Sequence, residues 1–342
     1  MATNPVRLSI CIATFNRGRF IGETLASILP QASDEVEVVV ADGASSDNTE
    51  EIVRDIAARH PQLRYIRLEK KGGVDQDYCK AVERAVGEYV WLFTDDDLVK
   101  PGAVAAVLVA MQKNFSLIVV NAEVRNLDLT QTIVQRRMTL ESDQSFSFDA
   151  IGRNYFMAAA GVYLSFIGSV VMRREIWNQR EKAKYIGTAF VHIGAIFQSP
   201  MPGNALVMKH PWIVIRYGNA EWVARKFGIW MFSWPNLIWS FPDYADWAKK
   251  TVTEREPWRS LPSLLLERAM GHYSIKDYDA WLAKRSQSWM GRNFRKAVAI
   301  TPIRPLNFLA RIIVRWIFQK YPSIAMNDLE AWRCQAAKPP KA

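Results

Sequence analysis

Residues 88–97 read Glu-Tyr-Val-Trp-Leu-Phe-Thr-Asp-Asp-Asp, so an apolar run from Tyr89 to Phe93 leads directly into three carboxylates. An uninterrupted apolar run after Gly87 is typical of a strand buried on both faces, as in a parallel sheet. Neighbouring carboxylates repel one another, and such a cluster is stabilised when it holds a cation. Hard oxygen ligands suit a divalent cation that also binds substrate phosphates. The alternative is a solvated acidic turn before a helix, because Asp favours helix starts.

Strands and helices alternate along the N-terminal third of the chain. Apolar patterns with a helix between each successive pair predict strands at 6–12, 35–40, 65–68, 88–94 and 116–121. This order indicates right-handed βαβ units and a mostly parallel sheet. Because ligands bind beyond the carboxyl ends of such strands, we expect the polar loops to converge on one crevice. These loops are 13–17, 41–47, 70–77 and 94–97.

The segment from Tyr155 to Met172 carries no charge and is followed by two arginines, so its length is marginally compatible with a membrane span. Gly161 and Gly168 interrupt it, however. We therefore predict a helix at about 148–163 and a buried strand at about 166–172. The polar stretch at 125–147 predicts a loop or hairpin near the site.

The composition is basic: 44 Lys and Arg stand against 34 Asp and Glu, and the C-terminal third carries most of the excess. A basic face suits an anionic partner such as phosphate-rich lipid, nucleic acid or nucleotide. No recognition motif for nucleic acid accompanies the charge, so we expect no nucleic-acid partner. The three cysteines are too scattered for a disulfide framework, and the N-terminus shows no signal-peptide pattern. Both features favour a cytoplasmic location.

Three regions are predicted from these patterns: an α/β domain at 1–217, a helical, aromatic-rich and basic region at 218–330, and a disordered tail at 331–342. Within the second, residues 305–320 form an amphipathic pattern. Leu306, Leu309, Ile313 and Trp316 share one side of it, with arginines opposite. Such a helix either lies on the surface of an anionic membrane or docks on the protein core.

The loops resemble those of the family-2 glycosyltransferases of GT-A fold. The resemblance rests on Ala13-Thr-Phe-Asn-Arg17, Asp42-Gly-Ala-Ser-Ser-Asp47 and the strand that ends in the Asp cluster, over about 6–120. Gly73-Val-Asp-Gln-Asp77 and the segment Tyr185–His192 are similar to the abequosyltransferase-type branch, which transfers deoxysugars in O-antigen or related surface polysaccharide assembly. The resemblance implies a Rossmann-like sheet flanked by helices. It also implies transfer from a nucleotide-sugar donor to a saccharide acceptor, expected to be lipid-linked at the inner face of the cytoplasmic membrane.

Carried onto matching positions, the resemblance assigns binding roles to several side chains. Those expected to bind the nucleotide sugar are Thr14, Asn16, Arg17, Asp42, Lys71, Asp75 and Asp95. Asp42 is expected to hydrogen-bond the base. Arg17 and Lys71 either contact the phosphates or are solvated surface cations. Asp96, with Asp95 second, is expected to hold Mg²⁺ or Mn²⁺, which stabilises the charge on the departing diphosphate.

The sequence departs from the family pattern at two places. Thr94 stands where the family has the first Asp of its metal motif. His192 stands where the family usually has a Glu-Asp pair that supplies the catalytic base. The resemblance therefore assigns His192 and Asp97 to catalysis, since a histidine can act as a base. The alternative is that His192 is a hydrogen-bonded core residue.

Two other functions stay open at this point. A nucleotidyltransferase uses a related sheet and metal site, but its Gly-rich signature after the first strand is reduced here to a single glycine, Gly18. A degenerate transferase that acts as a non-catalytic scaffold would accommodate the departures at Thr94 and His192. The donor, the acceptor and the stereochemical course are not predicted.

Overall fold

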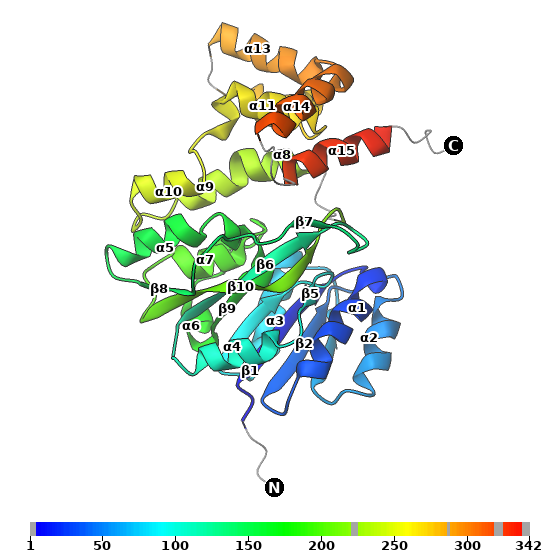
Figure 1. Cartoon of the computed structure of the whole chain (residues 1–342), viewed down its shortest axis with the longest axis vertical. Coiled ribbons are helices and arrows are strands. Elements are labelled where there is room, and N and C mark those ends of the chain that lie inside the picture. Colours follow the sequence, from blue (N-terminus) through cyan, green and yellow to red (C-terminus); the bar gives the residue numbers. More distant parts are fainter. Residues whose placement is uncertain (1–4, 220–224, 286–287, 318–323, 337–342) are drawn as a thin grey trace. The chain divides into compact units, whose positions relative to one another are not determined.

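The chain folds into two compact units, shown in Figure 1 as a computed structural model that describes residues 5–219, 225–285, 288–317 and 324–336. Unit 1 contains Met1–Tyr217 and Phe241–Val252, and unit 2 contains Gly218–Ser240 and Thr253–Ala342. The structure thus assigns the segment Phe241–Val252 to the α/β unit, whereas the sequence groups it with the C-terminal region.

Unit 1 is built around a mixed sheet with the strand order β3-β2-β1-β4-β9-β6-β10-β5. Its first four strands are parallel, as predicted: β1 (Leu8–Thr14), β2 (Val36–Asp42), β3 (Leu63–Arg67) and β4 (Tyr89–Phe93). The register places Leu8 opposite both Val36 and Tyr89. All five side chains of β4 are fully buried, which explains its uninterrupted apolar sequence.

The other strands add antiparallel pairs. They are β5 (Leu98–Val99), β6 (Leu117–Arg125), β7 (Thr132–Val134), β8 (Gln144–Ser147), β9 (Val170–Arg173) and β10 (Asn204–Arg216). β9 runs antiparallel to both β4 and β6, while β10 is parallel to β6. The polar stretch at 125–147 thus contains two short strands, and the strand expected at 166–172 begins at Val170.

Helices cover the sheet of unit 1, and α1 and α2 pack side by side in Figure 1. The helices of this unit are α1 (Gly18–Ile28), α2 (Thr49–Ala57), α3 (Val74–Arg84), α4 (Ala103–Met111), α5 (Gly152–Ala160), α6 (Arg174–Gln179), α7 (Val191–Phe197) and α10 (Asp246–Val252). α1 buries Phe20, Ile21, Leu25 and Ile28, a spacing that gives a helix one apolar face. Because α5 ends at Ala160, the uncharged segment 155–172 is a helix followed by a buried strand.

Unit 2 is helical. Its α-helices are α8 (Lys226–Gly228), α9 (Trp234–Trp239), α11 (Leu261–Ala269), α12 (Ile275–Asp277), α13 (Trp289–Ile300), α14 (Ile303–Ile317) and α15 (Ile324–Ala336). One core cluster is aromatic, with Phe227 stacked on Tyr273 at a centroid distance of 4.6 Å. A second, smaller cluster joins α11, α14 and α15 through Ala269, Val314 and Leu329. α15 reaches Ala336, so it extends into the segment predicted as a disordered tail, of which residues 337–342 lie outside the described residues.

Within the described residues, no single helix has the length and apolar composition needed to cross a membrane. The helices Trp289–Ile300 and Ile303–Trp316, bent by 94° from one another, reach that length and apolar composition only when they are taken together.

Candidate active site

The carboxyl ends of β1, β2 and β4 lie next to one another, because the parallel register aligns them. Thr14 is opposite Asp42, and β4 pairs with β1 as far as Ile12 opposite Phe93. The loops that follow these three strands therefore begin at the same edge of the sheet, where ligands bind in open α/β sheets. The predicted convergence of loops 13–17, 41–47 and 94–97 follows from this register.

Asn16 joins the first two loops. Its backbone N–H donates to Ser45 Oγ at 2.8 Å, and its Oδ1 accepts from the backbone N–H of Ser46 at 2.8 Å. The residue has a φ of 54°, in the left-handed region that Asn tolerates better than most residues. Asn16 thus fixes the position of the loop after β1 relative to the loop after β2.

Asp42 is fully buried and binds donors from its own unit. Its Oδ1 accepts from the Ser45 N–H at 2.9 Å and from Ser45 Oγ at 2.6 Å. Its Oδ2 accepts from the Tyr65 hydroxyl at 2.6 Å and lies 3.6 Å from Arg67. The direct contact with a base that the sequence predicts for Asp42 would add to these bonds or replace one of them.

Asp95 and Asp96 face one cation. The Arg17 guanidinium lies 3.5 Å from Asp95 Oδ1 and 3.8 Å from Asp96 Oδ2. Burial, with the nearby Asp96 charge, raises the pKa of Asp95 to about 7, while Arg17 and Thr14 act in the opposite direction. The structure therefore brings Thr14, Arg17, Asp95 and Asp96 together, as the sequence predicts.

Asp97 has a different role within the same turn. It is buried, its Oδ2 accepts from the Thr94 hydroxyl, and its Oδ1 accepts from the backbone N–H of Arg216 at 2.7 Å. Burial and the Asp96 charge raise the pKa of Asp97 well above its usual range. Because both carboxyl oxygens accept bonds from the protein, this geometry supports a structural role for Asp97 and gives no support to the predicted catalytic one.

Arg216, at the end of β10, is a site residue that the sequence did not reveal. Its Nε donates to the Asp96 carbonyl at 2.9 Å, and its guanidinium also donates to the Leu127 carbonyl at 2.9 Å and pairs with Glu23. It is only 6% exposed. This buried arginine holds the acidic turn against the sheet. The one sequence signal for it was a cation at the end of an apolar segment, which is common on protein surfaces.

Asp75 connects two segments that are more than one hundred residues apart in sequence. Its Oδ2 accepts from the backbone N–H groups of Gly187 and Ala189, each at 2.8 Å, and its Oδ1 accepts from Val191 N–H at 2.9 Å. The carboxyl is buried, and burial raises its pKa despite these bonds. Asp75 therefore anchors loop 186–191 in front of α7, whereas the sequence assigned it to the nucleotide sugar.

His192 lies in the first turn of α7 and is 1% exposed. Its Nε2 is 2.9 Å from the Leu164 carbonyl, which can only accept, so Nε2 carries the proton and donates. Nδ1 is buried and has no hydrogen-bond partner among the described residues. Burial lowers the pKa of His192 to about 4, which makes the ring a weak base at neutral pH. These observations favour the core alternative over the predicted base.

Lys71 is exposed, and its Nζ lies 3.6 Å from the centroid of the Phe15 ring. The two residues come from the loops after β3 and β1, so the cation lies against the loop that follows β1. A cation held over an aromatic face is attracted by the ring quadrupole and stays available to an anion. This position is compatible with the predicted phosphate contact.

The donor set of the acidic turn fits a metal ion that is completed by substrate. No group of three or more His, Cys, Asp or Glu side chains among the described residues is arranged to hold a metal. Asp95 and Asp96 nevertheless both present hard oxygens toward the Arg17 guanidinium. Mg²⁺ is typically held by one or two carboxylates together with substrate phosphates. The two residues therefore suit such an ion only when a diphosphate supplies further ligands.

Two curated proteins with similar sequences are named as sugar transferases. The chain is 25% identical over 206 residues to the abequosyltransferase RfbV of Salmonella typhimurium, which covers 56% of this chain and 62% of that protein. It is 28% identical over 103 residues to a GalNAc(5)-diNAcBac-PP-undecaprenol beta-1,3-glucosyltransferase of Campylobacter jejuni, covering 30% and 33%. The chain thus spans less than two thirds of the length of either curated relative.

A solved structure shows the same fold. The crystal structure of Staphylococcus aureus TarS 1-349 in complex with UDP-GlcNAc matches 96% of this chain and 92% of that chain, with a TM-score of 0.54 at 15% identity. The GT-A fold class that the sequence predicts is confirmed.

The family is established by the N-terminal half of the chain. The model of glycosyl transferase family 2 matches residues 9–179, which is half of the 342 residues. This range begins in β1, ends in α6, and contains the three loops that meet at the sheet edge together with the acidic turn. The chain belongs to glycosyl transferase family 2.

Proposed function

We propose that the protein is a glycosyltransferase that moves a sugar from a nucleotide-sugar donor to a saccharide acceptor in surface polysaccharide assembly. The observation that carries this proposal is the pair Asp95 and Asp96, which face one cation where the ends of β1, β2 and β4 meet. The similar proteins support the reaction class, because their names describe an abequosyltransferase and a glucosyltransferase.

The nucleotide of the donor lies over the first two loops in this proposal. Thr14 and Asn16 line its pocket, and Asp42 holds the loop that receives the base. Arg17, beside Asp95, and Lys71, over the Phe15 ring, attract the diphosphate. On donor binding, the Arg17 guanidinium exchanges its two carboxylate partners for phosphate oxygens, which recognise a guanidinium equally well.

Asp96, assisted by Asp95, would hold Mg²⁺ or Mn²⁺. When bound, such an ion stabilises the negative charge that develops on the departing nucleoside diphosphate. The protein's own contribution is to keep the two carboxylates in place: Arg216 binds the Asp96 carbonyl, and Thr94 binds Asp97.

The acceptor is proposed to bind near loop 186–191, which Asp75 anchors. A deoxysugar donor is consistent with the similarity to the abequosyltransferase RfbV. A lipid-linked acceptor is consistent with the name of the Campylobacter jejuni relative, which acts on an undecaprenol-linked saccharide. Such an acceptor would place the reaction at the inner face of the cytoplasmic membrane.

A thermal-shift panel tests the proposal. UDP, GDP, dTDP and CDP are each added with and without Mn²⁺, and a ligand that binds only the folded protein at 100 times its Kd stabilises it by about 2.7 kcal/mol. We expect one nucleotide to raise the melting temperature clearly more with Mn²⁺ than without. The hit then identifies the donor class for a transfer assay. Binding without any transfer would instead favour the scaffold alternative.

Two substitutions test the site itself. Asp42→Ala removes the hydrogen bonds of the nucleotide loop, and Asp96→Ala removes the preferred metal ligand. Each is expected to lower transfer strongly. If both variants keep full transfer activity, the assignment of this crevice is wrong.

A further inference from the structure

Helix α14 packs on unit 2 through one face only. Leu306, Ala310 and Val314 point into the cluster formed with α11 and α15. Asn307, which is 3% exposed, donates from Nδ2 to the Ala269 carbonyl at 3.0 Å and to the Leu329 carbonyl at 2.9 Å. The face of α14 that carries Leu306, Ala310 and Val314 therefore docks on the protein core, which was one of the two alternatives for this helix.

The opposite face of α14 is apolar and exposed. Successive residues of an α-helix are about 100° apart, which places five large apolar side chains on the side away from the core. Their exposed fractions range from 52% to 74%: Phe308, Leu309, Ile312, Ile313 and Trp316. Arg304, Arg311 and Arg315 fall in a narrow strip along the edge of this face. An amphipathic helix that buries one face in a lipid interface has this order of apolar centre and cationic edge.

Helix α13 repeats the arrangement. Val298 and Ala299 are buried in the aromatic cluster of unit 2. Trp289, Met290, Phe294 and Ile300 are 51% to 74% exposed. The cations Arg292 and Lys296 also lie on the exposed side.

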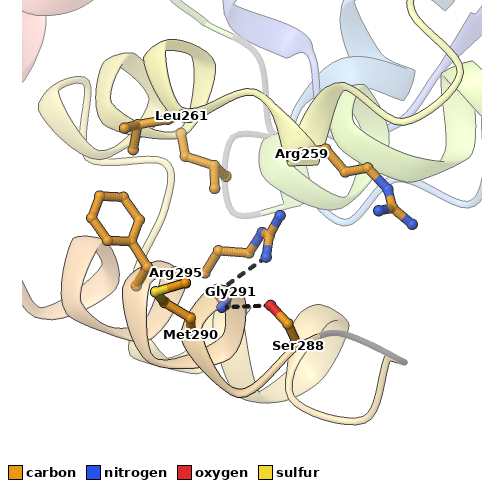
Figure 2. A pocket seen from close by; sticks show the side chains of 8 residues that line it. Arg259, Leu261, Ser288, Met290, Gly291 and Arg295 are labelled. Carbon is orange, nitrogen blue, oxygen red and sulfur yellow. Dashed lines mark hydrogen bonds between the residues drawn. The ribbon is translucent and has the colours of Figure 1, made fainter.

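A pocket of about 240 Å³ extends the apolar surface of α13 toward α11. Figure 2 shows Met290 and Leu261 in its lining, together with the Arg295 side chain that donates to the Gly291 carbonyl. The exposed apolar area is therefore continuous from the start of α13 into this pocket.

The charge along the stretch of sequence that contains both helices has one sign. Residues 280–327 contain nine Lys and Arg and no Asp or Glu. A surface of this kind attracts an anion, and each Lys or Arg near an anionic bilayer adds to the attraction. A protein partner would have to bury this apolar face and also supply many carboxylates, whereas an anionic bilayer offers an apolar interior and negative headgroups at once.

We propose that the exposed faces of α13 and α14, here called the α13–α14 surface, dock on an anionic lipid bilayer. The inference deepens the proposed function, because it names the surface through which the enzyme reaches a lipid-linked acceptor. It is tested by vesicle binding alone, so its failure leaves the proposed transfer reaction untouched. Failure of the transfer assay likewise leaves the membrane proposal untouched.

Co-sedimentation of the full chain with vesicles is the test. Vesicles of phosphatidylcholine alone are compared with vesicles that contain phosphatidylglycerol, and we expect sedimentation with the second kind. About 1 M salt should release the protein, because the Debye length falls to about 3 Å at that ionic strength. No sedimentation with the anionic vesicles overturns the proposal. Sedimentation that survives both high salt and alkaline carbonate also overturns it, since it indicates a broken span formed by the bent helix pair.

Charge variants separate the surface from overall net charge. The test variant replaces three exposed cations of the surface by Gln: Lys296, Arg304 and Arg315. The control replaces three exposed cations of unit 1 by Gln: Arg59, Lys80 and Lys113. Both lower the formal net charge by three, from +10 to +7. Partitioning should weaken on the order of 100-fold in the test variant only. An equal loss in both variants would show binding driven by net charge and overturn the proposal.

Apolar variants test insertion. The test variant carries Phe308→Ser, Ile312→Ser and Trp316→Ser. The control carries Ser at three exposed apolar positions of unit 1: Val86, Val109 and Ile151. We expect at least a tenfold loss of vesicle binding in the test variant, with circular dichroism showing the fold retained. Unchanged vesicle binding together with a concentration-dependent dimer in light scattering, abolished by the test variant, would assign the face to a second copy of the chain and overturn the proposal.

Discussion

Asp75→Asn tests whether the buried carboxylate anchors loop 186–191 or binds the donor. The side chain keeps its size but loses one acceptor oxygen. The amide orientation that retains most bonds places its oxygen where Oδ2 now accepts from Gly187 and Ala189. The amide nitrogen then faces the N–H of Val191, donor against donor, at the site of a present 2.9 Å bond.

The magnitude follows from these three bonds. A buried N–H without a partner costs about 1–3 kcal/mol, and the two retained bonds weaken because their acceptor is no longer charged. Relief from burying a charge offsets part of this loss, since burial raises the pKa of Asp75. We therefore expect a local cost of about 2 kcal/mol, equivalent to about 30-fold faster opening of the loop.

Hydrogen exchange measured by mass spectrometry on a peptide that spans residues 186–192 reads this opening directly. The matched control is Asp77→Asn, on the same helix, which removes charge from a carboxyl that accepts from Gly72 at 3.1 Å. Exchange in residues 186–192 should accelerate in the Asp75 variant and not in the control. Equal exchange in both variants and the parent protein would refute the anchoring role.

Steady-state kinetics of Asp75→Asn then separate the two roles. An anchored acceptor loop predicts a higher KM for the acceptor with the donor KM unchanged. A higher donor KM with normal exchange at 186–192 would mean that Asp75 contacts the nucleotide sugar, as the sequence suggested, and our interpretation of the loop would fail.

Three further predictions concern the acidic turn and α7. Because the pKa of Asp95 is raised to about 7 in the folded protein against about 3.9 in the unfolded chain, metal-free stability should fall as pH rises from about 4 to 7; melts in EDTA should show this slope, and Asp95→Asn should reduce it, since the raised pKa values of Asp75 and Asp97 act in the same direction. Arg216→Ala leaves the Asp96 and Leu127 carbonyls without their charged donor and should cost about 2–4 kcal/mol in urea unfolding, and a loss below 1 kcal/mol would contradict its role. His192→Gln keeps a donor for the Leu164 carbonyl and should retain transfer within about threefold; a loss of about 100-fold at unchanged melting temperature would establish His192 as the base.

Much of the fold and part of the site follow from local patterns. Strands β1 to β4 have apolar sequences separated by helical patterns, so their positions and parallel order were predictable. The convergence of the loops at Thr14, Asn16 and Asp95 then follows from topology alone. The antiparallel direction of β9 was not predictable, because four buried residues carry no sign of which way their strand runs.

The residues whose structural contacts the sequence did not reveal act through distant partners. Asp75 has the composition of a ligand residue, but its partners lie 112 to 116 residues later and are backbone groups with no side-chain signature. Arg216 binds a carbonyl 120 residues earlier. Residue type suggests the chemistry that a side chain can perform. Only the fold determines whether other groups of the protein already occupy its hydrogen-bonding atoms.

The departure at Thr94 has a physical reason in this geometry. Thr94 donates to Asp97, and Arg216 donates its backbone N–H to the same carboxyl, so Asp97 is held inside the turn. An Asp at position 94 could not donate when ionised and would place a fourth carboxylate in a cluster whose pKa values are already raised. Thr94 therefore leaves Asp95 and Asp96 as the pair that faces a cation. The shifted motif is consistent with a working metal site that uses these two carboxylates, and does not by itself indicate a degenerate one.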